Sequence, residues 1–85
     1  MEYVIVAFRS RAETVAFAKF LTNNGINNQI VNTPKEAGVG CGLSVKINKV
    51  YLSAIKRAIN TLKTKSFAGF FVVKRVNGKN IIHTI

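Results

Sequence analysis

The sequence predicts a small α+β domain with a ferredoxin-like two-layer arrangement. Its elements follow the order β-α-β-β-α-β, and a C-terminal hairpin strand is added. Three observations lead to this fold: a strongly apolar first strand, two helices with polar caps, and an Asn77-Gly78 turn near the end of the chain. The chain has 85 residues, so we expect a single domain over residues 1–85.

The first strand is predicted over residues 3–8, a continuous β-branched and aromatic run typical of a strand that is apolar on both faces. Ser10 and Glu13 then have the spacing of a capping box. In that motif the Ser10 hydroxyl accepts from the Glu13 amide, and the Glu13 carboxylate accepts from the Ser10 amide. A first helix therefore begins after Ser10 and ends near Gly25, because glycine tolerates the left-handed conformation after a helix.

The middle of the chain predicts two strands and a second helix. Residues 28–32 form a short strand, and Pro34 indicates a loop over residues 33–42. Apolar and polar residues alternate over residues 43–47, which is typical of a strand with one buried face. Asn48 is expected to cap a helix over residues 49–64, whose apolar face carries Tyr51, Ile55, Ala58, Ile59 and Leu62.

A fourth strand is expected to open at Phe70, and Asn77-Gly78 predicts a tight hairpin because both residues accept positive φ. Counting outward pairs Val76 with Lys79 and Val73 with Ile82. Residues 81–85 then form an edge strand, where His83 lies near Val72 and has a structural role. Phe70 and Phe71 must point to opposite faces. One of them would leave an apolar patch that the helices do not cover, so we expect a homodimer through this patch or the edge strand.

The charge is strongly positive and unevenly placed. The chain has 13 Lys and Arg residues against 3 acidic ones, and residues 43–85 hold nine of the 13 and none of the acidic ones. Such asymmetry suggests an anionic partner. Lys49, Lys56 and Lys63 recur every seventh residue and predict a basic helix face, so one function to consider is a small nucleic-acid-binding module. No apolar run is long enough to cross a bilayer, and no cleavable signal opens the chain, which favours a cytoplasmic protein without membrane contact.

The segment most suggestive of chemistry is Gly38-Val39-Gly40-Cys41-Gly42. Gly40 and Gly42 leave the sulfur unshielded and let the backbone turn its amides inward, and Gly42 is expected to adopt a positive φ. The predicted topology places Arg9, Ser10 and Lys35 at the same edge of the sheet, where they would favour a thiolate. The alternative is a small buried thiol in a glycine-rich turn.

The residue types exclude several classes of protein. One Cys and one His exclude an internal disulfide and a zinc site of the Cys/His type, so no metal or cofactor is expected. Acid–base residues are too few for most hydrolytic chemistry, and we therefore expect a carrier or binding protein rather than an enzyme.

Thr33-Pro34-Lys35, a short spacer and Cys41-Gly42-Leu43 leading into a strand resemble the putative selenium/sulfur carrier protein-like family. The resemblance extends over about residues 1–60 and includes the first strand, the helix after Ser10 and the second strand. It implies a carrier in which Cys41 holds sulfur or selenium as a persulfide or selenopersulfide. It also implies donor and acceptor proteins as partners. The basic C-terminal segment with Asn77-Gly78 has no match in that pattern.

Overall fold

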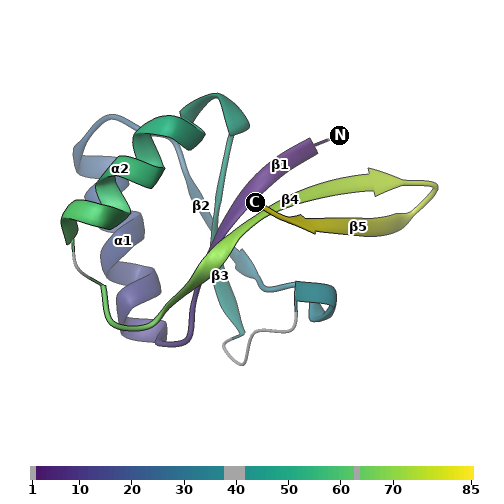
Figure 1. Cartoon of the computed structure of the whole chain (residues 1–85), viewed down its shortest axis with the longest axis horizontal. Coiled ribbons are helices and arrows are strands. Elements are labelled where there is room, and N and C mark those ends of the chain that lie inside the picture. Colours follow the sequence, from purple (N-terminus) through teal and green to yellow (C-terminus); the bar gives the residue numbers. More distant parts are fainter. Residues whose placement is uncertain (1, 38–41, 63) are drawn as a thin grey trace.

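The computed structural model describes residues 2–37, 42–62 and 64–85, which form one antiparallel sheet with two α-helices on one of its faces (Figure 1). The strands lie in the order β2-β3-β1-β4-β5. Their bounds, with those of the helices and two 3₁₀ turns, are β1 Glu2–Phe8, α1 Arg11–Asn23, β2 Gln29–Asn32, η1 Lys35–Ala37, β3 Leu43–Ile47, η2 Lys49–Tyr51, α2 Leu52–Leu62, β4 Phe67–Val76 and β5 Lys79–Thr84. The predicted α+β class is confirmed.

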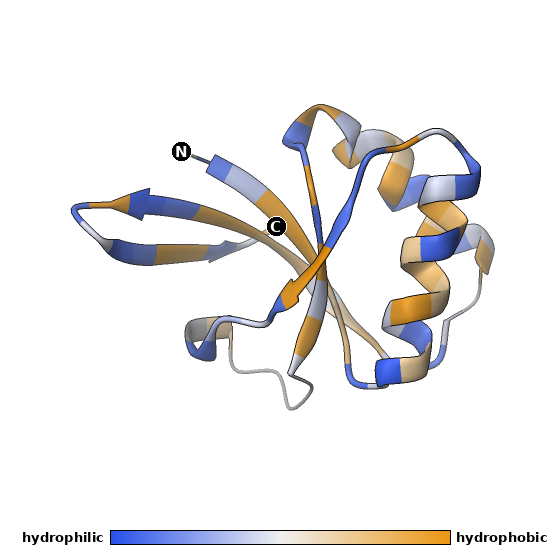
Figure 2. Ribbon diagram, turned by 180° about the vertical axis from the view of Figure 1, so that it is seen from behind, coloured by the Kyte–Doolittle hydropathy of each residue, from blue (hydrophilic) through white to orange (hydrophobic). Residues whose placement is uncertain are grey.

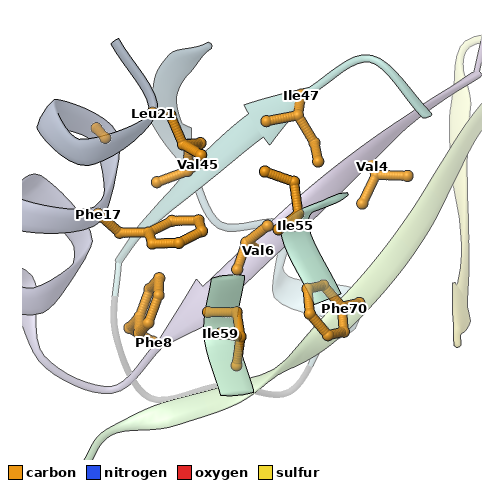
Figure 3. Close-up of a cluster of buried hydrophobic side chains, with 11 residues drawn as sticks. Val4, Val6, Phe8, Phe17, Leu21, Val45, Ile47, Ile55, Ile59 and Phe70 are labelled. Carbon is orange, nitrogen blue, oxygen red and sulfur yellow. The ribbon is translucent and has the colours of Figure 1, made fainter. Parts of the chain in front are cut away.

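The strand β1 is the centre of the molecule and is buried from Val4 to Phe8. Its alternate residues Val4, Val6 and Phe8 face the helices. There they join a core to which α1 gives Phe17, Ala18 and Leu21, β3 gives Val45 and Ile47, α2 gives Ile55 and Ile59, and β4 gives Phe70 (Figure 3). The predicted first strand and its burial on both faces are confirmed.

The face of the sheet away from the helices is also buried. Ile5 and Ala7 of β1 pack there with Phe71 and Val73 of β4. This second cluster is covered in part by Ala37 of η1 and by Ile82 and Val31 at its borders. Figure 1 shows η1 on the side of the sheet opposite the helices. Phe70 and Phe71 do point to opposite faces, but Phe71 is only 8% exposed, so the prediction of an exposed apolar patch on this face is wrong. Ala37, in the turn after β2, packs against this cluster. A homodimer through this face or through the edge strand stays a prediction.

The helix α2 starts later than the sequence predicts. The Asn48 side chain accepts from the backbone N–H of Val50 as expected, but the chain it caps is the 3₁₀ turn η2, and α2 begins at Leu52. Ile55 and Ile59 are buried as predicted, whereas Leu62 is exposed at the end of the helix.

The strand β4 begins at Phe67, three residues before the predicted start at Phe70. Its pairing with β1 shifts register between Ala7, which faces Gly69, and Phe8, which faces Phe67. The extra residue is a β-bulge, and Gly69 adopts a φ of 147° within it. The bulge lets Phe67 and Phe70 both face the helices although they are three residues apart, and their ring centroids lie 4.9 Å from each other.

The hairpin turn and its register agree with the sequence, but β5 spans Lys79–Thr84 instead of the predicted 81–85. Asn77 and Gly78 have φ values of 52° and 77°, as a two-residue turn that follows the sheet twist requires. The register pairs Val76 with Lys79, Val73 with Ile82 and Val72 with His83. Each of these predicted pairs is confirmed.

Replacing Gly69 by Ala should destabilise the fold by about 1–3 kcal/mol, because a side chain at this φ is strained and the rest of the sheet holds the bulge in place. Urea denaturation followed by circular dichroism measures the change. Gly42→Ala is the matched control, since Gly42 does not have a positive φ and a Cβ there meets no atom within 4 Å. Equal stability of the two variants would contradict a requirement for glycine in the bulge.

Candidate functional site

The loop that carries the predicted site is closed by hydrogen bonds at its base. The Thr33 amide donates to the Gly42 carbonyl at 2.9 Å. The hydroxyls of Thr33 and Ser44 lie 2.7 Å apart in a second hydrogen bond. Ser44 is fully buried, so β3 has two covered faces instead of the single buried face that its alternation predicts. The residues on either side of segment 38–41 are therefore fixed to the sheet, and Gly40 and Cys41 lie outside the described residues.

The start of α1 forms the neighbouring wall. Ser10 caps the helix with its hydroxyl, which accepts from the Glu13 amide at 3.3 Å. This half of the predicted capping box is confirmed, and the other half is wrong. The Glu13 carboxylate accepts instead from the backbone N–H groups of Lys65 and Ser66 and from the Ser66 hydroxyl. The Ser10 amide donates to the Ser66 hydroxyl oxygen.

These contacts clamp the beginning of α1 to the segment before β4. The Arg9 amide adds a hydrogen bond of 2.7 Å to the Ser66 carbonyl. The hydrogen bond from the Ser66 hydroxyl, together with those from the backbone N–H groups, lowers the pKa of Glu13 below its ordinary value. Glu13 thus stays ionised at neutral pH and holds the N-terminus of α1 in place.

A hollow of about 330 Å³ joins this helix start to the base of the loop. The described residues that line it are Arg11, Asn32, Gly42 and Leu43. Arg11 is the first residue of α1, where the backbone N–H groups of Arg11 and Ala12 have no acceptor within the helix. Arg11 and the positive end of the α1 dipole therefore lie beside the same hollow as Gly42.

Gly42 differs from the prediction in its backbone. It does not adopt a positive φ, and a Cβ there would meet nothing within 4 Å. The expectation that a β-branched residue would strain this position is therefore wrong. Neither the backbone conformation nor packing against the described residues requires glycine here.

The other residues predicted to stabilise the thiolate are not among the described residues that line the hollow. Arg9 and Lys35 are exposed. Ser10 uses its hydroxyl and its amide in the clamp, so its proposed role toward a thiolate stays a prediction. Arg11 was missed because the sequence assigned it only to the helix. Its position directly after the cap was the signal that could have found it.

The predicted basic face is divided by the structure. The Lys49 Nζ lies 2.8 Å from a Glu2 carboxylate oxygen, and the Lys74 Nζ lies 3.5 Å from the other. The hydrogen bond from Lys49 is the largest cause that lowers the pKa of Glu2. Lys56 lies over the Phe70 ring, 5.9 Å from its centroid, and Lys63 lies outside the described residues. Lys49 lies in η2 and is paired with the Glu2 carboxylate. It therefore does not share a free helical face with Lys56, which lies in α2.

The described residues contain neither a metal-binding cluster nor a membrane-spanning helix. No three His, Cys, Asp or Glu side chains among them are arranged to hold a metal ion. No helix within residues 2–37, 42–62 and 64–85 has the length and apolar character to cross a membrane.

The family model described as putative Se/S carrier protein-like matches residues 2–67. The match ends at the first residue of β4 and leaves most of the β4–β5 hairpin outside it. No curated protein and no solved structure matches the chain.

Replacing Glu13 by Gln should lower the stability at neutral pH and remove part of its dependence on acid. The folded state holds Glu13 at a pKa below its ordinary value of 4.5, so the unfolded state takes up the proton first as the pH falls. The stabilisation is complete above the unfolded pKa and is lost as the pH falls through the folded one. Urea denaturation at a series of pH values from 7 downward measures the free energy of unfolding. The values for the wild type and E13Q should converge as the pH falls below the folded-state pKa of Glu13.

Glu2→Gln is the control for this experiment. Glu2 is held by lysines, so its contribution should shrink at about 1 M salt, where the Debye length is near 3 Å. The contribution of Glu13 comes mainly from neutral N–H and O–H donors and should persist. If the contribution of Glu13 to the free energy of unfolding disappeared in salt, the hydrogen bonds from Lys65 and Ser66 would not be its main source.

Proposed function

The chain belongs to the putative Se/S carrier protein-like family, and from this premise we propose that it carries sulfur or selenium on Cys41. The observation that supports the proposal best is the hollow at the base of the loop. There Arg11 and the start of α1 border Gly42, the residue directly after the cysteine. This surrounding favours an anion, and a thiolate or persulfide is an anion.

The proposed transfer keeps atoms and electrons in balance. The Cys41 thiolate attacks the outer sulfur of a persulfide on a donor protein. A new S–S bond forms to Cys41, the S–S bond of the donor breaks, and the donor cysteine leaves as a thiolate. An acceptor thiolate then removes the outer sulfur in the same way. Selenium held as a selenopersulfide follows the same route.

The lone cysteine suits this chemistry. A second cysteine would convert the loaded state into an internal disulfide, and this chain has none. We propose that the protein is a carrier and not an enzyme, with donor and acceptor proteins as its partners. A reducing compartment such as the cytoplasm would keep Cys41 available for loading.

The described architecture supports a finer assignment of the fold. The order β2-β3-β1-β4 with two helices on one face fits the ferredoxin-like arrangement, and β5 extends it beyond β4. We propose this topology for the domain formed by β1 to β4 and the two helices, with β5 as the added C-terminal hairpin strand.

The reactivity of Cys41 provides the test. Because the chain has one cysteine, iodoacetamide alkylation reports on it alone. We expect a midpoint below about pH 7.5, compared with ~8.5 for a free thiol. Arg11→Gln should raise the midpoint by roughly 0.2–0.7 units, the equivalent of about 0.3–1 kcal/mol for a charge at a helix end. Lys19→Gln, which removes a charge from α1 about two turns further along the helix, should leave it unchanged.

Intact-mass measurement then tests the carrier role directly. After incubation with a persulfide donor, the wild type should gain the mass of one sulfur atom, reductant should remove it, and Cys41→Ser should gain nothing. A midpoint at or above the free-thiol value, or no labelling before denaturation, would identify Cys41 as a packed thiol and overturn the proposal.

A further inference from the structure

The outer edge of the sheet at β5 carries a surface that the core does not use. On the face directed toward the helix layer, the register places Val76 opposite Lys79, Lys74 opposite Ile81, and Val72 opposite His83. Ile85 follows, with its amide bonded to the Phe70 carbonyl at 3.1 Å. We call this set the β5 surface; it consists of Lys74, Val76, Lys79, Ile81, His83 and Ile85.

The β5 surface is open to solvent. The hairpin extends away from both helices (Figure 1), and Val76, Ile81 and Ile85 are 45%, 43% and 43% exposed. Figure 2 shows hydrophobic and hydrophilic residues following one another along β4 and β5. Large aliphatic side chains so exposed on a small domain commonly mark an interaction site.

Along β5, this face carries in order a cation, an aliphatic residue, a histidine and a second aliphatic residue. They are Lys79, Ile81, His83 and Ile85. The complementary ligand is an extended chain that presents acidic and aliphatic side chains alternately on one face. Both ion pairs among the described residues are made by Glu2. Glu2 neutralises part of the Lys74 charge on β4, and neither of its pairs reaches β5. Neither ion pair of Glu2 neutralises Lys79, so the positive charge of Lys79 can attract an acidic partner.

The backbone of β5 can hold such a ligand. β5 is the last strand of the described sheet, and the Ile85 amide points toward β4. Because neighbouring residues of an antiparallel pair alternate in direction, the N–H groups of Asn80, Ile82 and Thr84 point away from β4. We propose that the β5 surface binds an extended acidic and aliphatic segment of a partner protein, which adds to the sheet as a sixth strand.

The observations favour this ligand over two others. Single-stranded nucleic acid is bound by basic residues together with aromatic stacking platforms, whereas the exposed apolar residues of the β5 surface are aliphatic. A second copy would bring another chain of net charge +10 against Lys79, and the two chains would repel one another.

The position of the surface links it to the site. The turn η1 lies against β5, and Ala37 and Ile82 pack on the same buried cluster. A strand added to β5 therefore docks beside the segment that leads into residues 38–41. The proposal goes beyond the carrier function and stands without it, because its test involves no property of Cys41.

The test uses a synthetic peptide of alternating Glu and Val. We expect it to bind in fluorescence anisotropy and to slow amide hydrogen exchange at Asn80, Ile82 and Thr84 by at least about tenfold, as measured by NMR on the wild-type protein. The double variant Lys79→Glu/Ile81→Ser should lower the affinity roughly five- to tenfold. Lys19→Glu/Ile30→Ser is the matched control. It makes the same change in charge and hydrophobicity beside the β2 edge, where Ile30 is 40% exposed, and should bind as the wild type does.

Three results would overturn the proposal. The first is absence of peptide binding, or equal binding of an alternating Lys and Val peptide. The second is tighter binding of oligothymidine or of RNA without protection of the three amides, which would identify a nucleic-acid surface. The third is protection of these amides at rising protein concentration without peptide, which sedimentation would identify as self-association through β5. Each result leaves sulfur loading of Cys41 to be judged by its own measurement.

Discussion

The burial of β1 on both faces is the constraint on which the rest of the structure depends. Val4, Val6 and Phe8 require a cover on one side of the sheet, and Ile5 and Ala7 require one on the other. The chain has two α-helices among its described elements, and both lie on the first side. The second side is covered in part by Ala37 of η1, with Ile82 of β5 and Val31 of β2 at its borders. The loop that carries the cysteine is thus also a structural element, because the turn that opens it covers part of the core.

Polar contacts over long sequence distances then orient the site. Glu13 forgoes the local bond to the Ser10 amide and bonds to Lys65 and Ser66, 52 and 53 residues away. Backbone donors there would lack partners without it, and an unpaired backbone group is costly when it is removed from water. These hydrogen bonds join the start of α1 to the segment that leads into β4. Arg11, directly after the cap, is thereby held against the base of the loop.

The parts of this fold that local chemistry determines could be read from the sequence. Asn77 and Gly78 fix the hairpin register because positive φ at two adjacent positions admits few turns, and Ser10 marks the start of α1 because an N-cap needs only its own turn. The errors arise where distant segments meet. The Ser66 partner of Glu13, the covering of Phe71 by η1 and the bulge at Gly69 depend on contacts that no spacing encodes. Arg11 belongs to the same group, since only the packed structure brings it to Gly42.

The proposed transfer from a single cysteine requires that the partner proteins be held close to the sulfur. Without a second thiol to retain the intermediate, donor and acceptor must be held close long enough for exchange, and small contacts around one sulfur bind weakly. A docking surface away from the reacting atom solves this, because it adds affinity without shielding the sulfur. In this chain the open hollow at Gly42 and the exposed β5 edge are separate, and η1 lies between them against β5. The matched family region ends where β4 begins. Most of the hairpin that holds Lys74, Arg75 and Lys79 lies outside that region. In the two proposals, its charge and its edge bind the partner, and the matched region carries the cysteine.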